Sequence, residues 1–195
     1  MSKKGYIERV KKGPDSFALL TNAKVVNDIS VYLSDLTLVG GWLPYIYSNY
    51  LWKTKIRNPI VTVDIDFGVD QTVGGDYSKT IFETLSRLDY KERHLKLDRM
   101  FPVVLYKEKV PVEFITYPAV DIKAIEKMVG TEMQINKIEK FDFLLHHRVS
   151  VIIKNKKGDK TYTLNCPKPS TFLYHKGEST GLFVYNYLLH TGHFV

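Results

Sequence analysis

Alternating apolar and polar residues predict the strands of a mixed β-sheet. The clearest alternation covers residues 60–67, where valine, isoleucine and phenylalanine alternate with Thr62, Asp64 and Asp66. This two-residue period is typical of a strand with one apolar and one polar face. β-Rich runs on either side of polar turn sequences predict two hairpins. We therefore expect strands at residues 36–39, 60–67, 101–106, 110–116, 148–153 and 161–164.

Apolar residues that recur at helical spacing predict helices between these strands. The first helix follows a polar start, and the second begins after the Gly40-Gly41 pair. A glycine-rich loop at residues 68–76 leads into the third helix, while Asp121 and Gly130 would cap the two ends of the fourth. The expected helices cover residues 17–35, 42–52, 81–88, 121–129 and the segment from Ser170 onward.

Together these elements predict a single α+β domain (mixed α/β) covering residues 1–195. We expect a mixed central β-sheet flanked by helices, with a second β-hairpin and a C-terminal helix. Residues 1–14 would form a flexible basic N-terminus, residues 36–116 the core, and residues 140–195 the C-terminal hairpin and helix. No internal repeat or linker divides the chain.

The composition favours a soluble protein with an anionic partner. The 195 residues include 28 basic and 21 acidic ones, and the formal charge of +7 favours a nucleoside triphosphate, RNA or an acidic protein. The single cysteine, Cys166, cannot form an internal disulfide, which favours a cytoplasmic location. No apolar run approaches the length of a membrane span, so we expect no membrane contact.

Three acidic residues on the predicted strands form a candidate metal site. Asp64 and Asp66 are two residues apart, so their side chains would leave one face of a strand with Cα atoms about 6.5 to 7 Å apart. Such a pair is more often simply solvated, but two desolvated carboxylates repel each other unless a cation lies between them. Glu113, which lies between Val112 and Phe114, adds a third carboxylate. Carboxylate oxygens are ligands that Mg²⁺ and Mn²⁺ prefer.

The Gly40-Gly41 pair is a candidate phosphate-binding turn. It precedes a predicted helix, where main-chain amides can approach an anion because no side chains obstruct them. A tight turn that simply requires glycine explains the pair equally well.

The glycine pair and the acids together resemble the signature of the nucleotidyltransferase superfamily, whose members have a DNA polymerase beta-type fold. That signature comprises a Gly-Gly or Gly-Ser turn, an Asp-x-Asp strand and a third acid on a neighbouring strand. Within the superfamily the chain looks most like the AbiEii/AbiGii toxin nucleotidyltransferases. The resemblance is carried by the strings Leu38-Val39-Gly40-Gly41-Trp42, Val63-Asp64-Ile65-Asp66-Phe67 and Val112-Glu113-Phe114.

The resemblance implies a role for each residue of the candidate site. The acids would be catalytic and would bind the Mg²⁺ or Mn²⁺ that carries the nucleoside triphosphate (NTP) substrate. Lys176, in the last predicted helix after Pro167 and Pro169, matches a lysine that steadies the triphosphate, although a solvated helix lysine is an equal alternative. The implied metal ligands are Asp64, Asp66 and Glu113, and the implied nucleotide contacts are Gly40, Gly41, Trp42 and Lys176.

The chain departs from the family pattern in two places. Between Gly41 and Asp64 stand 22 residues, more than the family usually has. The family also continues beyond the lysine with basic residues and a Lys-Asp pair, whereas residues 177–195 contain no lysine or arginine. Because phosphoryl transfer depends on positive charge near the triphosphate, we expect this chain to bind a triphosphate but to transfer the nucleotide weakly.

The leading hypothesis is therefore a metal-dependent nucleotidyltransferase that moves a nucleoside monophosphate from an NTP to a hydroxyl of RNA, protein or a small molecule. The resemblance also implies a toxin–antitoxin system and an antitoxin protein as partner. One alternative is a catalytically inactive nucleotide- or nucleic-acid-binding module of the same fold. Another is an aminoglycoside-type small-molecule nucleotidyltransferase.

Other residues with chemical potential fit structural roles better. The histidines at positions 146, 147, 190 and 193 lack acid or cysteine companions at zinc spacing. Cys166 has no motif around it, which favours a buried thiol. The tyrosines of the second predicted helix, with Trp52, favour a packed aromatic face over a base-stacking surface.

Overall fold

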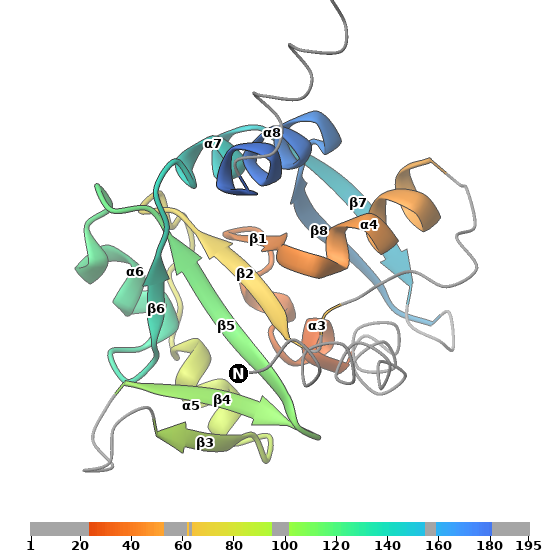
Figure 1. Ribbon diagram of the computed structural model, residues 1–195. Helices are drawn as coiled ribbons and strands as arrows, with labels where there is room; N and C mark the ends of the chain where they lie inside the picture. The colour runs from red at the N-terminus through yellow and green to blue at the C-terminus, as the bar shows by residue number, and fades with distance from the viewer. Residues whose placement is uncertain (1–23, 53–61, 63, 95–101, 155–158, 181–195) are drawn as a thin grey trace, which may run out of the picture.

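The computed structural model describes residues 24–52, 62, 64–94, 102–154 and 159–180, and a single mixed β-sheet forms its centre (Figure 1). The strand order is β3-β4-β5-β2-β1-β8-β7, and β6 pairs with the second half of β5. The strands are β1 (Leu36–Val39), β2 (Ile65–Val69), β3 (Lys91–His94), β4 (Val103–Lys107), β5 (Val110–Thr116), β6 (Ile135–Lys137), β7 (Arg148–Lys154) and β8 (Thr161–Pro167).

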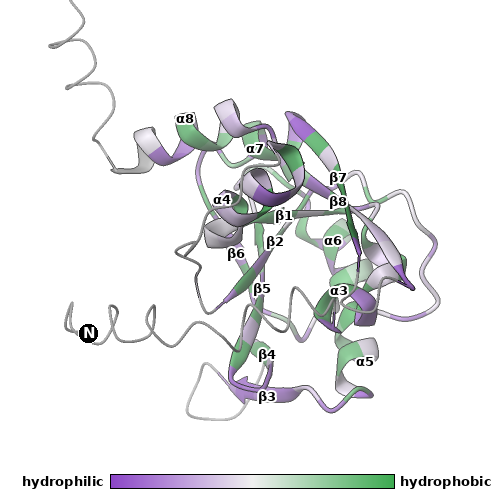
Figure 2. Cartoon of the chain, turned by 90° about the vertical axis from the view of Figure 1, so that its right-hand side faces the viewer, coloured by the Kyte–Doolittle hydropathy of each residue, from purple (hydrophilic) through white to green (hydrophobic). Residues whose placement is uncertain are grey.

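Helices connect the strands and pack on both faces of the sheet. In Figure 2, α3, α5 and α6 lie on the right-hand side of the central strands, and α4, α7 and α8 lie together at the top of the molecule. The α-helices are α3 (Lys24–Asp28), α4 (Leu43–Ile46), α5 (Ile81–Ser86), α6 (Ile122–Val129), α7 (Asp142–His146) and α8 (Pro169–Thr180). The shorter turns are the 3-10 helices η1 (Ser30–Tyr32) and η2 (Gly40–Trp42) and the π-helix η3 (Tyr47–Leu51).

The register of the three central strands aligns the candidate site. Strand β1 runs antiparallel to β2, and β2 runs parallel to β5. Val39 pairs with Asp66, and Asp66 pairs with Glu113. Paired residues of neighbouring strands point to the same face, so these three side chains form a row across the sheet.

The two faces of the sheet differ in what covers them. Ile65, Phe67 and Phe114 point to the first face, where they join the main core beneath α3, α5 and α6. The second face carries the row with Asp66 and Glu113. There a smaller apolar cluster forms beneath α7; it consists of Val39, Phe141, Leu144 and Leu145. The two faces of β2 and β5 therefore differ, because one is covered by the main core and the other carries the acidic side chains.

The structure confirms the predicted fold class, a mixed α+β sheet flanked by helices. Both predicted hairpins are present, because β4 pairs antiparallel with β5 and β7 with β8. The expected caps of α6 are also present: the Asp121 side chain accepts a hydrogen bond from the Lys123 amide at 3.1 Å, and Gly130 ends the helix with φ of +106°.

Several predicted boundaries were wrong. The second helix is not continuous, since residues 40–51 pass from a 3-10 turn through one α-helical turn into a π-helix. Strand β2 starts at Ile65 and continues to Val69, so Gly68 belongs to the strand and not to the following loop. Helix α5 ends at Ser86, which leaves Leu88 outside it and 38% exposed.

Other predicted elements lie partly or wholly outside the described residues. These are residues 1–14 of the basic N-terminus, positions 17–23 of the first helix, positions 60, 61 and 63 of the Asp-x-Asp strand, position 101 of the next strand and positions 181–195 of the final helix. Within the described part, the first helix covers only α3 before a 3-10 turn. Strands β3 and β6 and helix α7 were not predicted, because all three are short and lack a clear apolar period.

Candidate functional site

Asp66 is the centre of the candidate site. It lies in the middle of β2, between Val39 of β1 and Glu113 of β5. Adjacent strands are about 4.8 Å apart, so the Asp66 and Glu113 carboxylates start from neighbouring positions on the second face. Asp64 precedes β2 by one residue. Its main-chain carbonyl accepts hydrogen bonds from the Trp42 indole at 2.9 Å and from the Thr62 hydroxyl at 3.3 Å.

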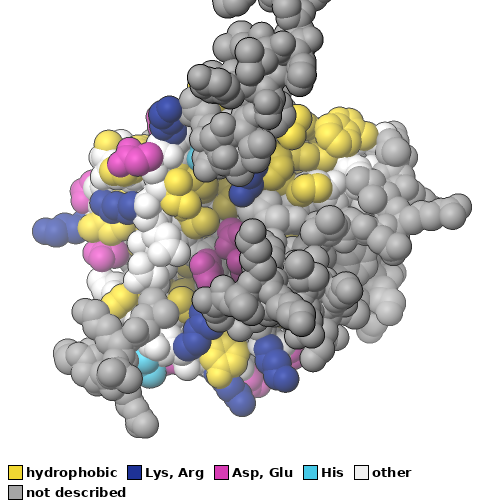
Figure 3. Space-filling view, in the orientation of Figure 1, with side chains coloured by type: hydrophobic (Ala, Val, Ile, Leu, Met, Phe, Trp, Pro, Cys, Tyr) yellow, Lys and Arg dark blue, Asp and Glu magenta, His cyan; other side chains and the backbone are white. Residues whose placement is uncertain are grey.

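Burial and mutual repulsion raise the pKa values of two carboxylates in this row. Asp66 is only 9% exposed, and burial raises its pKa to about 7, with Asp64 and Glu113 adding to the rise and Lys176 opposing it. Burial and the charge of Asp64 also raise the pKa of Glu113, which Arg93 opposes. Among the described residues, none donates a hydrogen bond to the Asp66 carboxylate. In Figure 3 acidic side chains form a small patch in the middle of this face, with lysine or arginine side chains above and below it.

The glycine pair packs directly against the acids. Gly40 has φ of +75°, a conformation that side chains of L-residues rarely adopt. A Cβ atom at Gly40 would overlap the carboxylate of Asp66, and one at Gly41 would overlap the side chain of Thr62. The turn therefore needs glycine at both positions for local space. Its location beside Asp66 also puts its main chain next to the acids.

Trp42 has a structural task that the sequence did not reveal. Its side chain is fully buried, and its indole nitrogen donates to the Asp64 carbonyl. A contact between Trp42 and a nucleotide would therefore have to use its main chain. The side chain instead fixes the backbone of the first acid against the glycine turn.

Two basic residues approach the acids from opposite ends of the sheet. Lys176 lies on α8, which follows β8, and its charge acts on Asp66. Helix α8 is held in place by Phe172, whose ring packs on Tyr47 with centroids 5.9 Å apart. Arg93 lies on β3 at the far edge of the sheet, and its charge acts on Glu113. Lys176 was a predicted site residue, whereas Arg93 was missed because β3 was not predicted.

The donor set of the row fits a hard divalent cation. Carboxylate oxygens are suitable ligands for Mg²⁺ or Mn²⁺. Among the described residues, however, no three histidine, cysteine, aspartate or glutamate side chains are grouped so that they could hold one ion together as they stand. The three acids interact electrostatically but are not preset around an ion.

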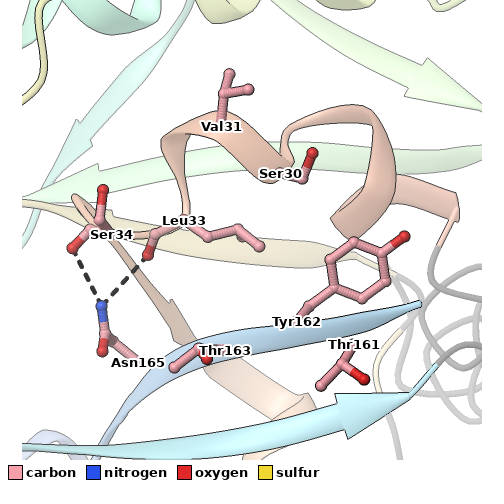
Figure 4. A pocket seen from close by; sticks show the side chains of 8 residues that line it. All are labelled: Ser30, Val31, Leu33, Ser34, Thr161, Tyr162, Thr163 and Asn165. Carbon is pink, nitrogen blue, oxygen red and sulfur yellow. Dashed lines mark hydrogen bonds between the residues drawn. The ribbon is translucent and has the colours of Figure 1, made fainter.

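A separate hollow of about 620 Å³ lies near the start of β1, at the opposite end of this strand from Gly40 (Figure 4). Hydroxyl groups and short apolar side chains line it, and none of its lining residues is charged. Asn165 closes one side by donating to the carbonyls of Leu33 at 3.3 Å and Ser34 at 3.1 Å. The hollow therefore has no charged side chain to pair with a metal ion or a triphosphate. The lining residues are Ser30, Val31, Leu33, Ser34, Thr161, Tyr162, Thr163 and Asn165.

The remaining candidates have structural surroundings. Cys166 is fully buried, and burial raises its pKa to about 12, as expected for a thiol that serves packing. His146 contacts the carboxylate of Asp70 at 3.3 Å. In the described part of the chain it belongs to no group of three side chains that could hold a metal ion. Tyr47 is buried in the main core, although Trp52 beside it is 55% exposed. The predicted histidine pair at positions 190 and 193 lies outside the described residues.

Comparison with known proteins agrees with the geometry of this face. A sequence model for a protein family described as "Nucleotidyltransferase" matches residues 21–177, which include the glycine turn, the three acids and Lys176. Searches of curated proteins and of solved structures found no match. The match does not separate the AbiEii/AbiGii group from other members. Within the described residues, no helix has the length and apolarity needed to span a membrane.

Proposed function

The chain belongs to the nucleotidyltransferase family, and on this premise we propose that it transfers a nucleoside monophosphate from an NTP to a hydroxyl acceptor. The observation that carries the proposal is the row of Asp66 and Glu113 beside the Gly40 turn, with Asp64 anchored next to it. In the reaction the acceptor oxygen bonds to the α-phosphorus, the bond from this phosphorus to pyrophosphate breaks, and the hydroxyl proton passes to water.

Asp64, Asp66 and Glu113 are the residues that would hold Mg²⁺ or Mn²⁺. When bound, the ion neutralises phosphate charge and orients the reacting oxygens. The protein's own part is positioning. Trp42 fixes the main chain of Asp64, and the sheet register fixes Asp66 beside Glu113.

The glycine turn and Lys176 form the proposed triphosphate end of the site. Both lie on the side of Asp66 that faces β1 and β8, because β1 leads into Gly40 and β8 leads into α8. In this proposal the main-chain amides of Gly40 and Gly41 would contact the phosphates, because glycine lets the backbone approach an anion closely. Lys176 adds a positive charge, which favours a polyanion and opposes the repulsion from Asp66.

The acceptor and the biological role extend this proposal. RNA, protein and small molecules all carry hydroxyl groups, and the family membership alone does not choose among them. A toxin paired with an antitoxin protein follows from the resemblance to the AbiEii/AbiGii group. An inactive binding module is the alternative favoured by one observation, namely that the acids are not preset around an ion.

A labelling experiment with the full chain tests the proposal. The protein is incubated with each NTP, Mg²⁺ or Mn²⁺, total RNA and a protein extract, once with label on the α-phosphate and once on the γ-phosphate. We expect the α-label alone to enter an acceptor. Asp66→Asn should abolish incorporation, while Asp70→Asn, the same chemical change four residues further on, should retain it. No α-label incorporation with any NTP would favour the binding module.

A further inference from the structure

The edge strand β3 carries opposite kinds of side chains on its two faces. Lys91 and Arg93 point to one face, and Glu92 and His94 point to the other, because side chains alternate along a strand. Glu92 and His94 contact each other on their own face, with 3.7 Å between the His94 imidazole and the Glu92 carboxylate. On the other face, the two side chains of β3 are Lys91 and Arg93. Both are basic and exposed.

The basic face of β3 is the one that continues into the candidate site. Arg93 pairs with Val104 of β4. The next residue of β4, Leu105, pairs with Val112, which directly precedes Glu113. Leu105 and Val112 point into the main core, so Val104 and Glu113 both point to the second face. Arg93 thus shares a face with Glu113 and lies about two strand spacings from it, or roughly 10 Å between Cα atoms.

The order of the strands gives the site two distinct ends. From one edge to the other, the order is β3 with Arg93, β4, β5 with Glu113, β2 with Asp66, β1 with the glycine turn, and β8 leading to Lys176. The triphosphate is assigned above to the end formed by the glycine turn and Lys176. The acceptor hydroxyl must approach from the other side of the phosphorus in an in-line displacement, which is the end with Glu113 and Arg93.

We propose that Lys91 and Arg93 bind the phosphates of a single-stranded nucleic acid whose sugar hydroxyl is the acceptor. This inference rests on the proposed function, because it assigns the acceptor of that reaction. In a nucleic acid the reacting hydroxyl lies a few bonds from a phosphodiester, so a hydroxyl at Glu113 brings a phosphate toward Arg93. The planar guanidinium matches the geometry of phosphate oxygens, and Lys91 contributes a second charge along the strand. The formal charge of +7 favours the same partner over long range.

A protein acceptor does not explain this surface as well. A serine or tyrosine hydroxyl carries no obligatory anion beside it. A protein acceptor therefore gives no reason for Lys91 and Arg93 to lie together on the face of Glu113. Arg93 also has Glu113 as an electrostatic partner, so a phosphate would have to share the guanidinium with this acid. Charge neutralisation of Glu113 alone would account for Arg93 but not for Lys91, which lies two residue pairs further along β3, opposite Tyr106.

Fluorescence anisotropy of the full chain with a labelled single-stranded RNA of about 12 nucleotides tests the surface without NTP or metal. The variants are Arg93→Gln, Lys91→Gln and their combination. The matched control is Lys123→Gln, an exposed lysine on α6, which packs on the first face of the sheet. We expect the double variant to lose about 10-fold or more in RNA affinity, with a salt dependence that is shallower by about 1 in slope for each lost phosphate contact. The control should change affinity less than about 2-fold, the range expected for a surface charge remote from the contact.

Two further measurements separate this inference from the proposed function. Binding of an NTP with Mg²⁺, measured by calorimetry, should be unchanged in the double variant, and thermal unfolding should show that each variant folds. In the labelling assay, Arg93→Gln should raise KM for RNA far more than it lowers kcat, and Arg93→Lys should restore part of the loss. Unchanged RNA affinity in the double variant, equal binding of an acidic peptide, or transfer to protein with no dependence on Arg93 would each overturn the inference. Absence of any transfer by the wild-type chain would instead overturn the proposed function.

Discussion

Replacing Asp66 with asparagine should stabilise the metal-free protein at neutral and alkaline pH. Asp66 is 9% exposed, and burial, together with Asp64 and Glu113, raises its pKa from 3.8 to about 7 against the opposing charge of Lys176. A pKa rise of about 3 corresponds to about 4 kcal/mol, because each factor of ten in a dissociation constant is worth about 1.4 kcal/mol. Asparagine keeps the shape but still needs hydrogen-bond partners, so we expect a gain of about 2 to 4 kcal/mol.

The pH dependence gives this prediction its sign. The native protein retains the Asp66 proton up to about pH 7, whereas the unfolded chain loses it near its ordinary pKa of 3.8. Between these values the native state binds more protons than the unfolded state, so the free energy of unfolding falls as pH rises. Above this window the full cost of the buried charge is present, and the variant should be more stable. Below it both side chains are neutral, and the difference should nearly vanish.

Urea denaturation in a chelator-containing buffer at about pH 4 and about pH 8.5 measures the effect, which the linkage relation predicts to appear only at the higher pH. Asp70→Asn is the matched control with the opposite sign. Burial raises the pKa of Asp70, but hydrogen bonds from Tyr117, the Gln71 amide and Thr72, with the charge of His146, outweigh burial and hold it below its ordinary value. This carboxylate stabilises the fold above the unfolded pKa, so its replacement should be destabilising at the higher pH.

Addition of Mg²⁺ completes the test. An ion that binds only the native wild type should raise its unfolding free energy, and the Asp66→Asn protein should not respond. A loss of more than about 1 kcal/mol for Asp66→Asn in metal-free buffer would refute the reasoning, because a carboxylate left without a partner on burial cannot be worth that much to the fold.

Three further variants probe the neighbours of this carboxylate. Gly40→Ala should cost about 1 to 2 kcal/mol or more from the positive φ alone, and it should abolish labelling because its Cβ would overlap Asp66, whereas Gly74→Ala, whose Cβ would meet only ordinary contacts, should be nearly neutral in both assays. Trp42→Phe removes the indole donor to the backbone of the acid pair, so we expect a loss of about 1 to 3 kcal/mol in unfolding free energy and a lower kcat with little change in KM for the NTP. Lys176→Gln removes the cation that opposes the raised pKa of Asp66, and it should weaken NTP binding in calorimetry while leaving RNA affinity unchanged.

The acids and the fold class could be predicted from the sequence because they depend on a local period. In β2 apolar residues alternate with Asp66 and Gly68, so a shift of one residue in pairing would turn Asp66 into the main core. Phe67 and Phe114 stack on the core face with centroids 6.3 Å apart and exclude that alternative. The alternation thus fixes the strand pairing, and the pairing fixes Asp66 beside Glu113.

The supporting residues depend on contacts that no local period encodes. Trp42 and Asp64 are 22 positions apart, and their hydrogen bond forms only because the chain folds the glycine turn back over the start of β2. The sequence indicated a nucleotide contact for Trp42 from its place in the family string, whereas its burial shows an anchoring side chain. A large apolar residue directly after a tight glycine turn is consistent with either use, so the sequence cannot separate them.

Arg93 shows the same limit at longer range. Lys-Glu-Arg-His has no apolar residue, so no hydrophobic period marks β3 as a strand. It becomes one because β4 offers an unpaired edge, and four residue pairs between the two strands satisfy that edge. The pairing with β4 then places Arg93 on the face of Glu113. A charged strand at this edge protects the sheet from association. In the proposed reaction the same strand would also supply the cations at the acceptor end of the site, so its four residues would link the integrity of the sheet to the choice of acceptor.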